Sequence, residues 1–131
     1  MTLDELEKSL PNGLHDAELV GLQVDYARRE AVLDFNVDCS EPPESEPYRP
    51  ARILFSGMQF LVIDPPADAD AYEAISIVDA GSGQPSTAPC KLPLLDRECF
   101  LCWLFVSRWN GFIRIAARSV ALEWLDRKQA P

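Results

Sequence analysis

The chain has 131 residues, a hydrophobic fraction of 47% and a formal net charge of −9, which suits one domain with a core of its own. The acidic balance disfavours nucleic acid and anionic membranes as partners, because both reward clustered Lys and Arg. The first residues do not resemble a signal peptide and no run approaches about 18 apolar residues, so we expect a cytoplasmic protein.

The N-terminal residues predict one short helix. Thr2 can cap it, and Glu5, three residues later, can complete a capping box. Leucines then recur at helical spacing until Pro11 ends the segment. A helix of about two turns is not stable alone, so it must dock its leucines on the rest of the protein.

A first β-hairpin follows. Residues 18–27 and 31–38 alternate apolar and polar side chains, which is typical of half-buried strands. With Arg29 and Glu30 as the turn, the apolar side chains of both strands fall on one face of the pair. That agreement supports the pairing.

The opposite face of this hairpin is acidic. In the predicted register Asp25 stands directly opposite Asp34, and Asp38 lies further along the same face. Like charges that face each other destabilise a sheet. The patch could therefore receive a basic partner or weakly hold a hard cation, whereas the plain alternative is a solvated outer face.

The middle of the chain alternates expected loops and strands. Clustered proline, glycine and serine predict long loops at residues 41–50 and 80–93, and the polar tail 126–131 is expected to fray. Three further strands are expected at 51–55 and 59–63, which flank Ser56 and Gly57, and at 72–79.

The longest apolar run, residues 99–125, holds all three tryptophans and the dipeptide Asn110-Gly111. Asn-Gly between two β-prone runs is a strong signal for a two-residue hairpin turn, because both turn residues need positive φ. The run therefore predicts paired strands at 99–108 and 112–117, with a further strand at 120–125.

One face of this second hairpin mixes aromatic residues with arginines. In the predicted register Trp103 stands opposite Arg118, where a cation–π contact is possible. Trp and Arg are enriched at partner-binding surfaces; alternatively, both faces are covered within the monomer and the arginines extend past apolar neighbours. The candidate partner surface comprises Trp103, Phe105, Trp109, Phe112, Arg114 and Arg118.

Few residues suggest chemistry. Cys99 and Cys102 lie three apart on an expected strand, so their sulfurs should point to opposite faces. With a single histidine in the chain, we expect free thiols and no metal or cofactor. His15 beside Asp16 could act as a general base, but no GxSxG nucleophile motif is present. The alternative role for His15 is bonding to backbone where the first strand begins.

Seven or so strands and one helix predict a single mainly β (α+β) domain. A curled antiparallel sheet fits best, as a half-barrel or a small sandwich with a short N-terminal helix.

Two segments carry a resemblance. Residues 14–26, LHDAELVGLQVDY, and residues 108–124, RWNGFIRIAARSVALEW, resemble a group of small bacterial β-domains. That group is similar to immunity proteins of bacterial polymorphic toxin systems. The resemblance implies a non-enzymatic cytoplasmic binder that neutralises a toxin, and it implies no catalytic residues. A basic toxin would be steered to an acidic inhibitor. The alternatives are a homo-oligomeric structural protein, such as a homodimer, and a small hydrolase or metal-dependent enzyme using His15 and Asp16.

Overall fold

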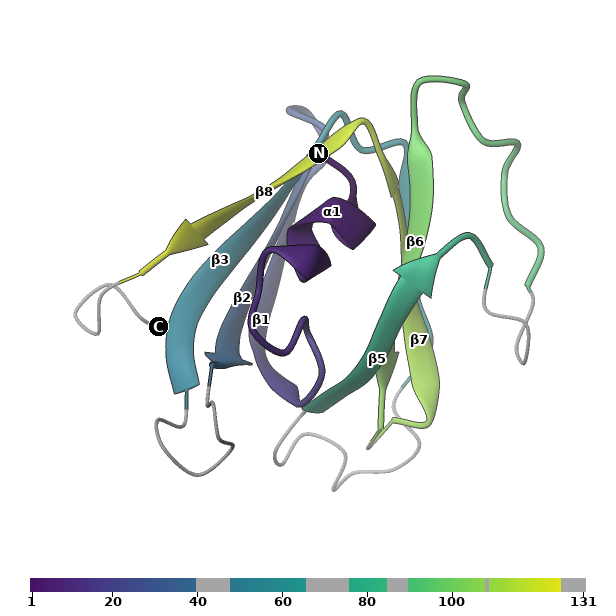
Figure 1. The fold of residues 1–131 in the computed structure, drawn as a ribbon. Coiled ribbons are helices and arrows are strands. Elements are labelled where there is room, and N and C mark those ends of the chain that lie inside the picture. The colour runs from purple at the N-terminus through teal and green to yellow at the C-terminus, as the bar shows by residue number, and fades with distance from the viewer. Residues whose placement is uncertain (40–47, 66–75, 85–89, 108, 126–131) are drawn as a thin grey trace.

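The structure is a computed structural model that describes residues 1–39, 48–65, 76–84, 90–107 and 109–125. One helix is followed by a series of antiparallel strands (Figure 1). Their bounds are α1 (Leu3–Lys8), β1 (Ala17–Asp25), β2 (Glu30–Asp38), β3 (Tyr48–Ser56), β4 (Phe60–Ile63), β5 (Ser76–Ser82), β6 (Phe100–Val106), β7 (Gly111–Ala117) and β8 (Ser119–Trp124).

The eight described strands form a curled sheet in the order β4-β7-β6-β5-β1-β2-β3-β8. Two four-stranded halves face each other, and α1 lies in the opening between them (Figure 1). The halves are joined through β1 and β5, which among the described residues pair at Ala17–Ile77 and Glu18–Ser76. Over the described residues β4 and β8 remain edges, so the sheet does not close into a barrel. The predicted curled, mainly β fold with an N-terminal helix is confirmed, with eight strands rather than about seven.

The helix forms as the capping pattern predicts, because the Thr2 side chain accepts a hydrogen bond from the Glu5 backbone N–H at 3.3 Å. Leu3 and Leu6 are buried. The largest apolar side chains of the core come from both halves of the sheet and converge on α1. They are Phe35, Phe55, Leu33, Ile53, Leu104, Ile113 and Ile115.

The first hairpin pairs in a different register from the predicted one. Asp25 lies opposite Glu30, and Asp34 lies opposite Gly21, so the predicted Asp25–Asp34 pair is wrong. The cause is a longer turn: four residues separate β1 from β2, and one of them, Arg29, has a φ of 55°. From Gly21 to Asp25 each partner is therefore displaced by four residues, and this even displacement keeps the side chains of β2 on their predicted face. A bulge between Leu19 and Gly21 adds one more residue to the displacement at the start of β1.

The register of the second hairpin also differs from the predicted one. Trp103 lies opposite Arg114 and Phe105 opposite Phe112, so the predicted Trp103–Arg118 pair is wrong. Ser107, Trp109 and Asn110 lie in the turn, with Asn110 at a φ of 50°. The displacement is again four residues, and the predicted core face is indeed buried. Its buried members include Leu104, Val106, Ile113, Ile115 and Ala117.

Three predictions for the middle of the chain need correction. The β3 strand begins at Tyr48, within the expected loop 41–50, and β5 covers Ser76–Ser82, so residues 80–82 are strand rather than loop. The strands on either side of Ser56 and Gly57 are not neighbours, because β3 pairs with β2 and β8 whereas β4 pairs with β7. The rest of loop 41–50, the start of strand 72–79 and the tail 126–131 lie outside the described residues. In the part of the chain that is described, no helix has the length and apolar character needed to cross a membrane.

Candidate partner-binding surface

The aromatic residues of the second hairpin pack on one another. Every side chain of β7 is buried, including Phe112 at 7% exposed and Arg114 at 2%. The Phe112 ring meets the Trp103 ring edge-on, with centroids 5.5 Å apart, and lies 5.0 Å from the Phe105 ring. Such ring pairs stabilise the sheet beyond their buried area. Phe112 and Arg114 therefore serve the fold and are not presented to a partner.

Asp64, directly after β4, holds the buried arginine. Its carboxylate accepts hydrogen bonds from the Arg114 guanidinium at 3.0 Å and from the Phe112 backbone N–H at 2.9 Å. The Asp64 side chain also lies against Gly111, where a Cβ atom would come within 2.8 Å of it. The sequence interpretation missed Asp64, because the strand that supplies it becomes a neighbour of β7 only in the folded sheet.

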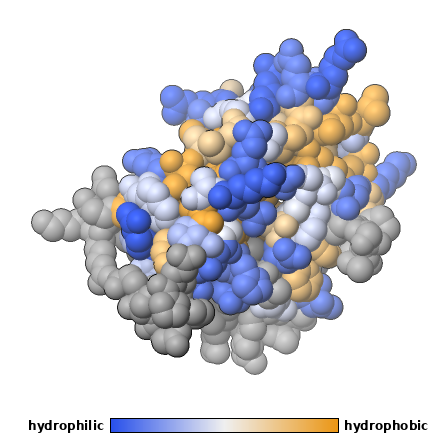
Figure 2. Space-filling model, viewed as in Figure 1, coloured by the Kyte–Doolittle hydropathy of each residue, from blue (hydrophilic) through white to orange (hydrophobic). Residues whose placement is uncertain are grey.

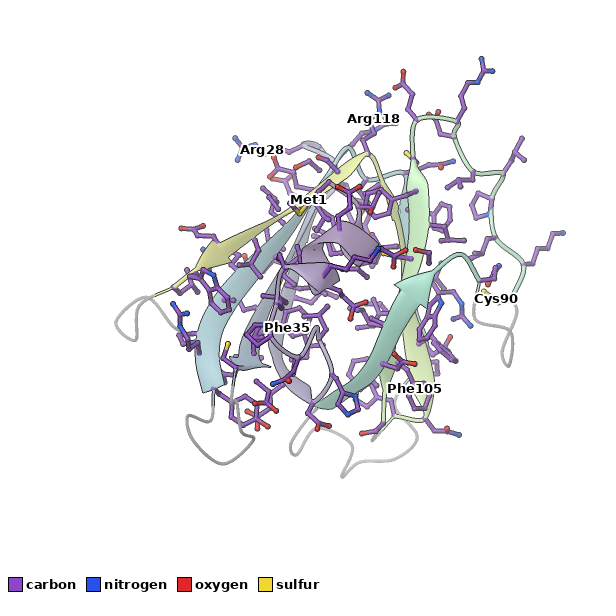
Figure 3. All side chains as sticks on the ribbon, viewed as in Figure 1. Met1, Arg28, Phe35, Cys90, Phe105 and Arg118 are labelled. Carbon is purple, nitrogen blue, oxygen red and sulfur yellow. The ribbon has the colours of Figure 1, made fainter. Side chains whose placement is uncertain are left out.

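The remaining residues of the aromatic set are dispersed. Trp103 is half-buried and covers Gly81 of β5, and Trp109 packs against the core. Arg118 is exposed and pairs with Glu98 at 3.2 Å. Figure 3 shows Phe105 and Arg118 at opposite ends of the molecule. The six predicted residues therefore do not form one continuous surface.

The acidic residues of the first hairpin have separate partners. Asp34 binds the Arg52 guanidinium of β3 at 2.8 Å, and this hydrogen bond raises the pKa of Arg52. Asp25 accepts a hydrogen bond from the Arg28 backbone N–H at 3.0 Å. The predicted Asp25–Asp34 cation site is therefore not assembled, although both carboxylates lie on the outer face of the sheet.

At the other end of this face, Asp38 lies opposite Tyr48 of β3. Burial is the larger cause of the raised pKa of the Tyr48 phenol, and the carboxylates of Glu18, Asp38 and Asp16 add to it. Carboxylates therefore lie near both ends of the outer face.

A shallow trough crosses this outer face. It consists of two hollows of about 650 and 270 Å³ that share Glu30 and Val32. The larger hollow is lined by side chains of β1, β2 and the turn between them, and the smaller by side chains of β2, β3 and β8. The complete lining is Gln23, Val24, Asp25, Tyr26, Arg28, Glu30, Val32, Arg52, Leu54, Ala121, Leu122 and Glu123.

The trough has an apolar floor and charged margins. Val32, Leu54 and Ala121 lie side by side on β2, β3 and β8. Glu30 lies on one side of this floor and Glu123 on the other. This arrangement was not visible in the sequence, because it depends on β8 pairing with β3.

His15 and Asp16 lie on the surface where β1 begins. Their side chains are 65% and 55% exposed, with 3.6 Å between Nε2 and Oδ2. Neither described hollow includes them. The geometry therefore gives no support to a catalytic site built on this pair.

The four cysteines are free thiols. Cys102 points into the core at 1% exposed, and burial raises the pKa of its thiol to about 12. Cys99 is half-buried, and its pKa is raised chiefly by burial. Within the described ranges, His, Cys, Asp and Glu side chains form no group of three that could hold a metal ion.

An exposed apolar segment lies apart from the trough. Hydrophobic side chains gather at the upper right of Figure 2, over the segment that precedes β6. Leu94 is 93% exposed there and Leu95 39%. The segment is tied to Gln59, whose side chain donates to the Leu94 carbonyl and accepts from the Asp96 backbone N–H, both at 2.8 Å.

Comparison with known proteins supports the fold. No family model matches the chain, and no curated protein matches it. Among solved structures, the chain is similar to the crystal structure of an uncharacterized protein from Neisseria gonorrhoeae, with a TM-score of 0.52 and 14% sequence identity. The similarity covers 85% of this chain and 93% of that one. It shows a shared fold, and the resemblance to immunity proteins stays a prediction.

Proposed function

We propose that this chain is a non-enzymatic protein-binding module that captures a basic protein, in the manner of an immunity-type inhibitor of a bacterial toxin. The observation that carries the proposal is the charge of the trough. Asp25, Glu30 and Glu123 line it together with Arg28 and Arg52, and Arg52 is already bound by Asp34. Carboxylates therefore dominate the charge that is available to a partner.

Such a surface suits inhibition of a toxin that acts on nucleic acid. A protein that binds a polyanion needs clustered Lys and Arg, and those residues complement an acidic face. Complementary charge steers the encounter and raises the association rate more than it raises final affinity. The inhibitor has only to cover the toxin, so it needs no catalytic group.

The test is co-expression with the product of each gene that lies beside this one. A toxin among them should form a stable complex with the chain, and the association rate should fall steeply as salt is added. The variant E30Q/E123Q should associate more slowly than the wild type. The control D79N/E98Q makes the same change in net charge at two exposed carboxylates outside the trough, and it should leave the rate nearly unchanged.

Two results would overturn the proposal. One is that none of the neighbouring gene products forms a complex with the chain. The other is a complex whose association rate responds equally to E30Q/E123Q and D79N/E98Q, because the trough would then have no special part in capture.

A further inference from the structure

We infer that the partner segment seated in the trough is a basic amphipathic helix that lies across the strands. This inference rests on the proposed function and adds the shape and chemistry of the bound segment. Because α1 lies in front of β1 and β2 in Figure 1, the outer face that carries the trough is turned away from the viewer. Three properties of the trough support the inference.

The first property is the length of the apolar floor. Val32, Leu54 and Ala121 occupy one level of three adjacent strands. Strands lie about 4.8 Å apart, so the floor spans roughly 10 Å across the sheet. Residues seven apart on one helix face are separated by about 10.5 Å. Three apolar residues at positions i, i+3 or i+4, and i+7 therefore match the floor.

The second property is the width between the margins. Glu30 and Asp34 lie four residues apart on β2, on either side of Val32. Four residues of a strand span about 13 Å. A helix with its side chains is about 10–12 Å across and fills this width. A single extended strand occupies only about 5 Å between its neighbours and would leave one margin without contacts.

The third property is the charge of the margins. Glu30 and Asp25 lie on one margin, in a hollow that Arg28 also lines, and Glu123 lies on the other margin. Arg52 stands beside Glu123 but is bound by Asp34. Positive side chains on both flanks of the apolar stripe of a helix would meet these carboxylates. The complementary segment therefore carries Lys or Arg on either side of three apolar residues.

Two synthetic peptides of about 14 residues with the same leucine and lysine content serve as probes. One places leucine at helical spacing, and the other alternates leucine with lysine as an amphipathic strand would. Each is titrated into the full chain at low salt, and binding is followed by calorimetry and by the NMR signals of the Val32 and Leu54 methyl groups. We expect the helical peptide to bind at least about tenfold more tightly, because only its leucines share one face at the spacing of the floor.

Matched variants locate the binding. L54S should weaken binding of the helical peptide, whereas L94S alters an equally apolar residue outside the trough and should have no effect. E30Q/E123Q should weaken binding severalfold and D79N/E98Q should not. Denaturant unfolding of each variant checks that the fold is retained.

The outcomes separate the two proposals. If the alternating peptide binds as tightly as the helical one and both lose affinity in E30Q/E123Q, the helix is wrong and the acidic docking face stands. If L54S and L94S behave alike, the apolar floor takes no part and the inference is overturned. If E30Q/E123Q weakens binding no more than D79N/E98Q does, the docking face and the helix are both overturned.

Discussion

Removing the carboxylate of Asp64 should destabilise the protein more than its position directly after the edge strand β4 suggests. Asp64 is 33% exposed, but the arginine that it binds is only 2% exposed. In D64A the guanidinium of Arg114 loses this carboxylate, and the Phe112 backbone N–H loses an acceptor. Arg114 stays buried in the variant, so water cannot replace the hydrogen bond that its guanidinium loses.

The magnitude follows from burial. Breaking a fully buried ion pair costs about 3–5 kcal/mol, and exposed pairs contribute about 0–1 kcal/mol. Because a third of Asp64 faces solvent, we place D64A between these limits, at about 2 kcal/mol. For a domain of this size that corresponds to a fall in Tm of roughly 8 °C. D64N keeps an acceptor for Phe112 and should lose only about 1 kcal/mol.

Urea unfolding followed by tryptophan fluorescence measures these differences. The control is E98A, which removes the carboxylate partner of Arg118 from a pair whose side chains are 65% and 53% exposed. It should cost no more than about 0.5 kcal/mol. If D64A and E98A unfold at the same urea concentration with the same slope, the reasoning about Arg114 is refuted.

Three further predictions concern the same fold. G81A should cost about 1–3 kcal/mol in urea unfolding, because the new Cβ would stand 2.6 Å from the Trp103 ring. G21A, with nothing within 4 Å of its new Cβ, should be neutral or stabilising, and equal effects of the two variants would contradict this account. Burial raises the pKa of the Glu7 carboxyl above its ordinary 4.5. The folded protein therefore holds the Glu7 proton more tightly than the unfolded chain does. Stability is lost as the pH rises through the folded-state pKa. E7Q should therefore be more stable than the wild type at neutral pH, with the difference closing as the pH falls below 4.5; a difference in stability that does not vary with pH would contradict it. Cys102, with a thiol pKa of about 12, should resist alkylation in the native protein near pH 8 and react in urea, as peptide mass mapping can test; rapid native labelling would show that the site opens.

The sequence located the turns of both hairpins but not their lengths. Asn110 and Arg29 each supply one residue of positive φ, whereas a two-residue turn of the predicted type needs two in succession. Gly111 instead belongs to β7 and pairs with Val106. In the second hairpin the displacement was an even number of residues, so its core face was predicted correctly and its cross-strand partners were not.

In the first hairpin a bulge between Leu19 and Gly21 leaves Val20 exposed and Leu19 buried, so the predicted buried face of β1 is wrong there. Asp25 and Asp34 were paired wrongly because the turn before β2 is longer than predicted.

Local sequence patterns could not predict contacts between segments that lie far apart in the chain. Nothing in the alternation of residues 59–63 indicates that β4 lies beside β7, so the bond between Asp64 and Arg114 could not be predicted. The floor of the trough depends in the same way on β8 lying beside β3. Periodicity reports which side of a strand is apolar, but the order of strands in a sheet is decided by packing across the whole chain.

The helix that bridges the two halves has a consequence for biosynthesis. The carbonyl of Met1 accepts a hydrogen bond from the backbone N–H of Val120, and Ser82 of β5 bonds to Asp4. The segment that contains α1 is therefore completed by a strand that is translated long after it. Until β8 emerges, the leucines of α1 have no complete binding site, so we expect the final collapse to follow translation of β8.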